Sequence, residues 1–427
     1  MRGRLIQQSQ SIDHFPPLHP SSINNRSSLP EPRRILVRGV NWLGDAVMTT
    51  PALHRLRERF PSAQIELLTH VKLADLWLDH PGIDNVITFT EGETVWSVAS
   101  SIRCAQVQNQ RGAPFDLALV LPNSPRSALE VRLAGIPQRI GYAKPWRSWL
   151  LTHRVDARPG HVAMHKRSAK EIRKLIRGDP LTHHASVLPN AFDEGGSRIT
   201  YHAASHQIHD YLHLASTMGT NPEPVPPELF IRHEEVHTFE KTWTPEARKK
   251  ALQRRGDKPL TFLGLNPAAA YGPAKRWPAE NFAAAVREVS RRLGNCVWLA
   301  VGGNEDVQLC EHIAGLAGGN VLNLAGKTSL RELMALLKLC RVLLTNDSGP
   351  MHVAAALGTP VVVPFGSTAP ELTGPGLQND ARHYLLKSDA PCSPCFRRTC
   401  PIDLRCMTGI SVPSVAEAVL GASGPRL

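Results

Sequence analysis

The sequence lacks the features that mark membrane-spanning and exported proteins. No window reaches the roughly 18 consecutive apolar residues of a transmembrane helix, and the first thirty residues contain no continuous apolar segment like that of a signal peptide. A bundle of membrane spans is therefore excluded, and we expect a cytoplasmic protein. The opening segment is rich in Ser, Pro and Asn and cannot bury enough apolar surface to fold, so residues 1–32 are expected to form a disordered tail.

Other patterns are missing as well. No G-x-G-x-x-G fingerprint follows the first expected strand, which argues against a simple dehydrogenase. No period of about 20 to 50 residues recurs, which argues against a solenoid. Cysteine is scarce, with eight in 427 residues, so a disulfide framework is not expected. Four of them, Cys104, Cys296, Cys310 and Cys340, are predicted to be small buried thiols.

What is present is the composition of a large globular protein. At about 150 residues per domain, 427 residues predict two or three domains. Lys and Arg outnumber Asp and Glu by 49 to 37, and this excess favours anionic partners such as phosphates, nucleic acid or acidic lipid. Because the chain has no aromatic stacking platform or recognition motif for nucleic acid, no nucleic-acid partner is expected.

Strand and helix patterns alternate along the chain in two series. The first begins at Arg33, with an apolar strand at 35–40 and a helical period at 48–60, and it continues to about residue 142. The second begins near Leu260 and continues to about residue 366. Such alternation is typical of open parallel sheets. We therefore predict an α/β fold of two doubly wound, Rossmann-like domains, with a site between them.

The domain boundaries are predicted from where these patterns weaken. The segment 155–235 is polar, with many His and Pro, and holds two helical stretches. We assign an N-terminal domain to 33–235, which includes that divergent segment, a linker to 236–258, a C-terminal domain to 259–390, and a Cys-rich segment with a final helix to 391–427.

In open α/β sheets, ligands bind beyond the carboxyl ends of the strands, so the loops there are the candidate site. One of them, 345–352, follows an apolar strand and opens a helix of small residues, whose first N–H groups and dipole favour a phosphate. Ser348 and Gly349 permit close approach of an oxyanion, and Asp347 can accept sugar hydroxyl protons. The alternative is that Asp347 and Ser348 only cap the helix.

Two further loops carry charges that suit group transfer. Lys275 and Arg276 stand just before Trp277-Pro278, where an ammonium could neutralise a leaving diphosphate or, alternatively, lie solvated on a surface turn. Asp45 follows Gly44 in the first loop, where a carboxylate facing the cleft could act as a general base or could cap the next helix.

Together these residues resemble a known family, the ADP-heptose:lipopolysaccharide heptosyltransferases, and in particular the heptosyltransferase II group. The resemblance covers roughly Arg33 to Arg154 and Leu260 to the C-terminus. It is carried by the blocks NWLGDAVMTTPAL (41–53), 116–155, AAYGPAKRWPAENFA (269–283), 345–375 and CSPCFRRTCPIDLRCM (392–407).

The resemblance implies a GT-B fold in which the C-terminal half holds ADP-heptose and the N-terminal half holds the Kdo-lipid A inner core. It also implies direct displacement with inversion and no cofactor or metal for catalysis. Carried over by position, it makes Asp45 the catalytic base and Lys275 the leaving-group lysine. The nucleotide-sugar contacts that it implies are Asp347, Ser348, Gly349, His352 and, as a weaker match, Glu305.

An acceptor with carboxylates and phosphates calls for a basic N-terminal domain, and peripheral contact with the anionic inner membrane fits the same charge. Arg forks suit carboxylate and phosphate groups, although each of these residues could instead serve solubility. The acceptor-binding candidates in the matching segment are Arg126, Arg139 and Lys144, with Arg132 and Arg147 beside them. Alternatives are heptosyltransferase I, another acceptor, or a catalytically silent nucleotide-sugar-binding protein.

Two clusters have metal-ligand spacing. Cys392, Cys395, Cys400 and Cys406 form C-x2-C-x4-C-x5-C, which is typical of a structural zinc or iron–sulfur site; the alternative is a packed turn of free thiols. His206, His209 and His213 share one face of an expected helix, where solvated or hydrogen-bonded side chains are the stronger expectation than metal ligands.

Overall fold

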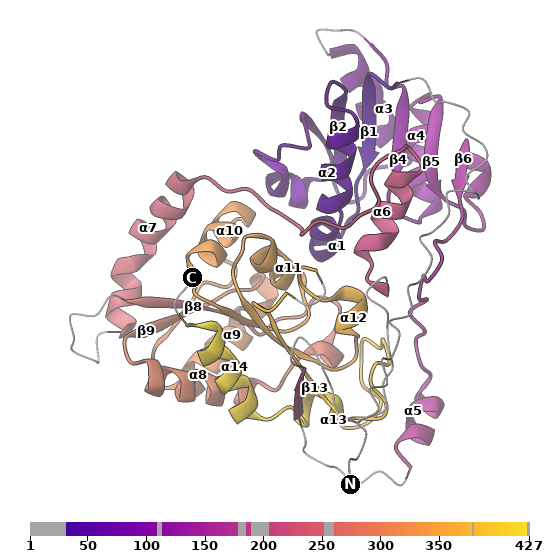
Figure 1. Ribbon diagram of the computed structural model, residues 1–427. Helices are drawn as coiled ribbons and strands as arrows, with labels where there is room; N and C mark the ends of the chain where they lie inside the picture. The colour runs from indigo at the N-terminus through magenta and orange to yellow at the C-terminus, as the bar shows by residue number, and fades with distance from the viewer. Residues whose placement is uncertain are drawn as a thin grey trace, which may run out of the picture.

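The structure, a computed structural model, describes residues 31–108, 113–177, 185–188, 205–251, 260–377 and 380–424. Most of the expected disordered tail, residues 1–30, lies outside these ranges. The described residues form two halves, each built on its own sheet, with the first half above the second in Figure 1. The predicted pair of doubly wound domains is confirmed.

The first sheet has six parallel strands in the order β3-β2-β1-β4-β5-β6. Its central strand β1 is buried along its whole length, as its sequence RILVR predicts apart from the two arginines. Arg34 and Arg38 are buried because each pairs with a buried carboxylate, Glu66 and Glu130 respectively. The strands are β1 (Arg34–Arg38), β2 (Gln64–His70), β3 (Asn85–Phe89), β4 (Leu117–Val120), β5 (Gln138–Tyr142) and β6 (His153–Val155).

Helices cover this sheet on both faces. In chain order they are α1 (Leu43–Met48), α2 (Thr50–Arg59), the 3-10 helix η2 (Val71–Trp77), α3 (Val95–Gln108), α4 (Pro125–Leu133) and the 3-10 helix η3 (Ser148–Leu150). The start of α4 is fixed by its sequence, since Ser124 accepts the N–H of Ser127 and Pro125 takes the first helical position.

The second sheet has seven strands in the order β10-β9-β8-β11-β12-β13-β7. All pair in parallel except β7, which is antiparallel to β13. The strands are β7 (Ala185–Leu188), β8 (Thr261–Asn266), β9 (Cys296–Ala300), β10 (Val321–Asn323), β11 (Leu343–Thr345), β12 (Val361–Phe365) and β13 (Tyr384–Ser388). Its central strands are apolar and fully buried, as in sheets covered on both faces.

The helices of the second half follow the same alternation. They are η5 (Pro273–Lys275), α8 (Ala279–Leu293), η6 (Asn304–Asp306), α9 (Val307–Ala317), α10 (Leu330–Leu339), α11 (Gly349–Ala356), α12 (Pro370–Thr373), α13 (Arg405–Thr408) and α14 (Val412–Ala422). Helix α14 returns to pack on α8 and closes the C-terminal half.

The middle segment contacts both halves. Helix α5 (Ala169–Leu175) and strand β7 lie with the second half, where Ile172 packs on Cys392 and Cys395 and β7 extends the sheet. Helix α6 (Ile208–Ser216) then packs on α2 of the first half, and α7 (His233–Ala251) packs on α10 of the second (Figure 1). The chain therefore crosses between the halves three times.

The structure differs from two expected boundaries. Residues 236–258, expected as a linker, include most of α7, which is a 19-residue helix. Residues 155–235, expected within the N-terminal domain, supply β7 to the second sheet. Local periodicity does not reveal the pairing of β7 with β13 or the packing of α7 on α10, because each involves a surface far away in the sequence. Among the described residues, no helix has the length and apolar character needed to cross a membrane.

Candidate active site

A cavity of about 600 Å³ lies between the two halves. Most of its wall comes from loops at the carboxyl ends of strands in both sheets, where the sequence placed the candidate site, and the middle segment and the cysteine segment supply the rest. The first half supplies Trp42 to Asp45 and Met48 after β1, and the second supplies loops after β8, β11 and β12. The second-half lining includes Tyr271, Lys275, Asp347, Ser348, Gly349, His352 and Thr368.

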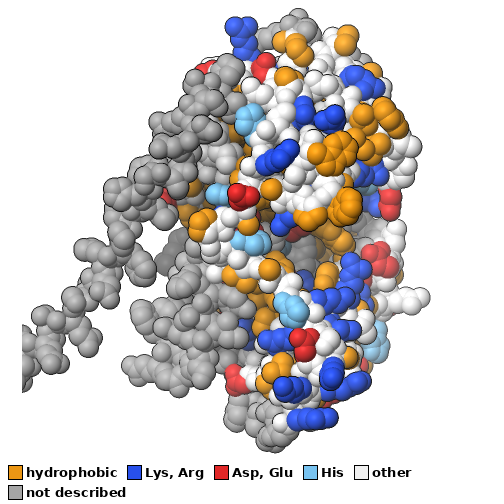
Figure 2. Space-filling model, turned by 90° about the vertical axis from the view of Figure 1, so that its right-hand side faces the viewer, with side chains coloured by type: hydrophobic (Ala, Val, Ile, Leu, Met, Phe, Trp, Pro, Cys, Tyr) orange, Lys and Arg blue, Asp and Glu red, His pale blue; other side chains and the backbone are white. Residues whose placement is uncertain are grey.

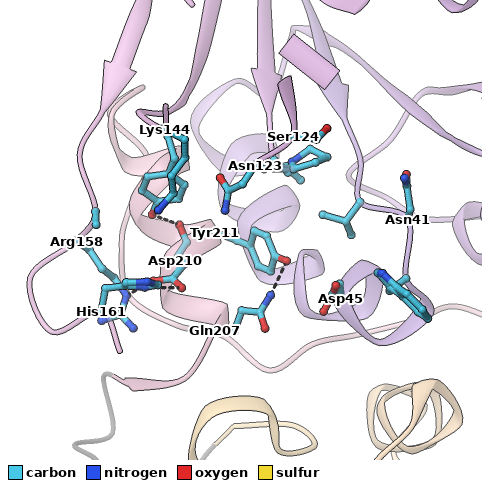
Figure 3. Close-up of a pocket in the computed structure, with 16 residues that line it drawn as sticks. Asn41, Asp45, Asn123, Ser124, Lys144, Arg158, His161, Gln207, Asp210 and Tyr211 are labelled. Atoms are coloured by element: carbon cyan, nitrogen blue, oxygen red, sulfur yellow. Dashed lines mark hydrogen bonds and ion pairs between the residues drawn. The ribbon is translucent and has the colours of Figure 1, made fainter. Parts of the chain in front are cut away.

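A smaller cavity of about 310 Å³ opens on the first half alone (Figure 3). Trp42, Asp45 and Gln207 line both cavities. Figure 3 shows Asp45 at one side of this space, with Gln207 and Tyr211 of the middle segment next to it and Lys144 beyond them. The Nε2 of Gln207 donates to the Tyr211 hydroxyl at 2.9 Å. Asp45 thus stands where two ligands bound in the two cavities would meet.

The environment of Asp45 suits a base that works near neutral pH. Burial raises the pKa of its carboxyl to about 6, with Lys275 opposing this shift and Asp347 adding to it. The carboxyl sits in α1, the first short helix after β1, and its helix has no side-chain cap. The alternative that Asp45 serves as an N-cap therefore fails, since it lies inside the helix that Trp42 precedes.

Lys275 and Asp347, 72 residues apart, form an ion pair in the wall of the larger cavity. The Nζ of Lys275 lies 2.6 Å from Oδ2 of Asp347, and the same oxygen accepts from the Thr368 hydroxyl at 2.6 Å. The Lys275 ammonium also lies 5.0 Å from the centroid of the Tyr271 ring. Asp347 is buried, so the pair holds one positive charge in a fixed place at the cavity rather than on a solvated surface turn.

Helices α1 and α11 of the two halves meet beside this pair, and glycine allows the contact. A Cβ on Gly44 would lie 2.7 Å from Cδ2 of His352, and a Cβ on Gly349 would lie 2.9 Å from Cβ of Leu43. Gly349, predicted to let an oxyanion approach, is thus closely approached by Leu43 of the other half. His352 is buried, which lowers the pKa of its imidazole to about 4 and leaves it neutral at pH 7.

Ser348 occupies the N-cap position of α11 but makes no capping bond with its side chain. Its hydroxyl instead accepts from Nδ2 of Asn266 at 2.8 Å. Asn266 ends β8 and is buried, so it ties the loop after β11 to the neighbouring strand. Glu305 lies elsewhere: it is exposed in η6 and does not line the larger cavity.

Of the three predicted acceptor-binding residues, only Lys144 lines the smaller cavity. The Nε of Arg126 lies 2.9 Å from the buried carboxylate of Glu130. Arg139 lies near the amino end of β5, away from the cavity, and donates to the carbonyls of Leu150 and Ile136. These partners come from tertiary packing, which the local pattern does not report.

The smaller cavity has other charged residues that sequence reasoning missed. Arg158 lies 2.6 Å from Asp210, and Nδ1 of His161 lies 3.2 Å from the same carboxylate. All three line the cavity (Figure 3). They belong to the middle segment, where neither periodicity nor the family resemblance gave a signal.

The metal site predicted at the four C-terminal cysteines finds no support in the structure. Over the described ranges, which include all four, no three His, Cys, Asp or Glu side chains gather closely enough to hold a metal ion. Cys392, Cys395 and Cys406 are buried, and burial raises the pKa of the Cys392 thiol to about 11. These three side chains pack among apolar residues, an arrangement that spacing alone does not distinguish from ligation.

The cysteine segment nevertheless reaches the larger cavity. Phe396 and Arg398 line it, and the Phe396 carbonyl accepts from the Tyr271 hydroxyl at 2.9 Å.

The three histidines of the middle segment, His206, His209 and His213, do not gather as a group of possible metal ligands. His206 is buried, and its Nε2 lies 3.0 Å from the carbonyl of Gly374. Its other ring nitrogen, Nδ1, accepts from the N–H of Ile208.

Two Rossmann-like domains that face each other across a cleft at the carboxyl ends of their strands define the GT-B fold class. The superposed structure of Escherichia coli ADP-heptose lps heptosyltransferase II has this fold, with a TM-score of 0.64, 23% identity, and coverage of 91% of this chain and 98% of that one.

Sequence comparison gives the family. The model of glycosyltransferase family 9 (heptosyltransferase) matches residues 196–405. The chain is 28% identical to lipopolysaccharide heptosyltransferase 2 of Escherichia coli (strain K12), over 84% of this chain and 91% of that protein. It is 27% identical to lipooligosaccharide heptosyltransferase 2 of Haemophilus ducreyi, over 80% and 86%. Through residues 196–405 the chain belongs to glycosyltransferase family 9 (heptosyltransferase), and over most of its length it is similar to these two enzymes.

Proposed function

We propose that the protein transfers heptose from ADP-heptose to a heptosyl-Kdo-lipid A acceptor, with inversion at the anomeric carbon. The observation that carries the proposal is the position of Asp45, which lines both the cavity between the halves and the cavity of the first half. A donor in the first and an acceptor in the second would present their reacting atoms to one carboxylate.

In this reaction the acceptor hydroxyl gives its proton to the Asp45 carboxylate as its oxygen bonds to the anomeric carbon. The bond from that carbon to the β-phosphate oxygen breaks, and ADP leaves with the electron pair. A carboxyl group whose pKa is raised to about 6 is ionised at pH 7 and is a stronger base than an exposed one. No cofactor is part of this step.

The second half supplies the groups that suit the leaving ADP. Lys275 is held at the cavity wall by Asp347 and can offset the charge that grows on the diphosphate. The start of α11 at Ser348 and Gly349 adds backbone N–H groups and the positive end of a helix dipole. We assign buried His352 mainly to the packing of α11 on α1 rather than to binding of the sugar. Glu305 is proposed to contact the nucleotide after the two domains move.

On the acceptor side, the proposal assigns Lys144, Arg158 and His161 to anionic groups of the inner core. All three line the smaller cavity. Arg126 and Arg139 are left out because their guanidinium groups are held by other partners. Since this acceptor is a lipid, the proposal includes a cytoplasmic enzyme in peripheral contact with the membrane that carries it.

One assay tests the proposal. Purified protein is incubated with ADP-heptose and either Kdo-lipid A or heptosyl-Kdo-lipid A, and the products are weighed by mass spectrometry, with Asp45→Asn as control. We expect a gain of one heptose on the heptosylated acceptor only. Transfer to Kdo-lipid A instead would assign heptosyltransferase I activity, and ADP binding without transfer to either would indicate a silent nucleotide-sugar-binding protein.

A further inference from the structure

The loop that follows β5 exposes two tryptophans. Trp146 is 86% exposed and Trp149 is 61% exposed, and Pro145 beside them is exposed as well. Exposed tryptophan is unusual, since the ring buries a large apolar area whenever a partner is present. Figure 2 shows hydrophobic side chains lying among Lys and Arg side chains over the N-terminal half, the upper part of that view.

The loop holds Trp146 outward at a cost to the backbone. Trp146 has a φ of 63°, a left-handed conformation that is an outlier for a bulky residue. The turn is closed by Ser148, whose hydroxyl donates to the Lys144 carbonyl at 3.0 Å and accepts from the Lys144 N–H at 3.2 Å. Arg147 is fully buried and donates to the Pro122 carbonyl, which fastens the loop to the end of β4. Such strain persists where the surroundings enforce it and often marks a functional element.

The charge around the loop has one sign. Residues 131–155 contain five Lys and Arg residues and no Asp or Glu. Lys144 is exposed in the turn itself, Arg154 donates to the Ser148 carbonyl at 3.0 Å, and the Arg132 guanidinium lies 5.5 Å from the centroid of the Trp149 ring. In the part of the chain that the structure describes, none of these three cations has an acidic partner within 4.0 Å.

The loop also lies at the mouth of the proposed acceptor cavity. Tyr142, the last residue of β5, and Lys144, in the turn, both line that cavity. Tryptophan favours the boundary between lipid headgroups and acyl chains, and each Lys or Arg near an anionic surface adds about 1 kcal/mol of attraction. Exposed rings together with unpaired cations match that surface, whereas a soluble protein partner would not require a single sign of charge.

We propose that the loop Ala143–Trp149 docks on the surface of an anionic lipid bilayer, with Trp146 and Trp149 in the headgroup boundary and Lys144, Arg154 and Arg132 against the phosphates. The inference rests on the proposed function for the location of the lipid acceptor. It deepens that function by placing the mouth of the acceptor cavity against the membrane.

Vesicle sedimentation tests this surface without any sugar transfer. The full chain is mixed with vesicles of phosphatidylcholine alone or of phosphatidylcholine with phosphatidylglycerol. We expect binding to the mixed vesicles only, weakened by added salt. The double variant Trp146→Gly, Trp149→Ala is expected to bind about tenfold or more weakly. The matched control is Trp96→Ala, which removes a 64% exposed ring that follows Glu91 and Glu93 in the sequence and should bind like the wild type.

The substitution Trp146→Gly also separates docking from folding. Glycine accepts a positive φ without strain, so the melting temperature of Trp146→Gly should equal or exceed that of the wild type while vesicle binding falls. Equal binding to both kinds of vesicle, equal losses in Trp96→Ala, or a self-associated wild type that the double variant makes monomeric would each overturn the proposal. If the transfer assay fails with every acceptor, the proposed function is wrong, but vesicle binding still tests whether this loop docks on a membrane.

Discussion

Asp45 shows how a single residue can combine a structural cost with a chemical use. Its carboxyl is placed by a short helix in a poorly solvated site between the two halves, and burial raises its pKa to about 6. Such groups are uncommon outside functional sites, because the fold gains nothing from desolvating a charge.

We expect Asp45→Asn to lower turnover by roughly 100-fold to 10,000-fold, the scale of a lost general base, with ADP affinity nearly unchanged. In the wild type, only the ionised carboxylate accepts a proton, so kcat/KM should decline as the pH falls through about 6. Steady-state kinetics across pH measure turnover and kcat/KM, and calorimetric titration measures the affinity for ADP. A variant that keeps more than half of the wild-type turnover would remove Asp45 from the role of base.

The same pKa gives the sign of a stability effect. The pKa of Asp45 in the folded protein is about 6, above the ordinary value of 3.8, so this carboxyl is harder to ionise in the folded state than in the unfolded state. Its contribution to stability is therefore fully present below about pH 4 and is lost as the pH rises through 6. Asp45→Asn should therefore stabilise the protein by about 1–3 kcal/mol at pH 8 and by much less at pH 4. Thermal unfolding at the two pH values provides the comparison.

Lys275 is the second residue whose charge is expected to matter for the reaction. Lys275→Met removes the ammonium from Asp347 and from the cavity, so we expect weaker ADP-heptose binding and a turnover lower by roughly 100-fold or more. The matched control is Arg276→Met, since Arg276 is the next residue and has only a long contact of 3.8 Å to Asp306. If both variants bind and turn over donor like the wild type, the lysine has no part in stabilising the leaving group.

At the scale of elements, the contact between α1 and α11 is the feature that joins the two halves of the site. Gly44 faces His352 and Gly349 faces Leu43, each at a distance that leaves no room for a Cβ. We expect Gly44→Ala and Gly349→Ala each to lower stability by about 1–3 kcal/mol through overpacking, and to lower kcat by moving Asp45 relative to Lys275.

The control for these substitutions is Gly315→Ala in the last turn of α9. A Cβ at Gly315 meets no atom within 4 Å, so the substitution should stabilise the helix by about 0.5–1 kcal/mol. The melting temperature and kcat of the three variants show whether a Cβ between α1 and α11 harms stability and the reaction. Wild-type kcat in Gly44→Ala would show that the two helices can separate without harm to the reaction.

The cysteine segment is an element whose role the sequence did not reveal. Cys392, Cys395 and Cys406 are buried, whereas Cys104 on α3 is exposed. In the native protein we expect an alkylating reagent to modify Cys104 first and the three buried thiols only after unfolding, since burial limits access of the reagent. Mass mapping over time measures the order. Rapid alkylation of all four cysteines of the segment would show that it is not packed as described.

Strand–loop–helix alternation was enough to predict two parallel sheets and most of the strand-end loops at the site, but it did not indicate β6, β7 or β13. Lys275 and Asp347 could be expected in one cleft because parallel strands bring their carboxyl ends to the same edge. Arg398, Gln207 and Arg158 could not, since they lie in irregular segments whose course depends on packing. Arg139 was misjudged for a related reason: a charge pattern does not show which guanidinium is already bound to a carbonyl.

At the scale of the whole molecule, two parallel sheets form the heptosyltransferase fold, and the middle segment holds them together. After leaving β6, the chain adds β7 to the far sheet, returns as α6 to the near one, and leaves again as α7. The contacts of His206 and Gln207 with Gly374 and Leu372 lie on this path. The two halves are thus connected at several places rather than by one linker.

This path has a consequence for exchanging parts between related enzymes. A chimera joined at a single point between residues 252 and 259 would replace the second sheet but keep β7 and α7 from the first parent. The new β13 would then pair with a foreign strand, or with none, and an unpaired edge strand invites association with other chains. We expect such a chimera to aggregate on size-exclusion chromatography. One that also exchanges residues 157–205 and 220–251 should remain monodisperse, so the two halves are inherited as interleaved pieces of sequence rather than as two consecutive modules.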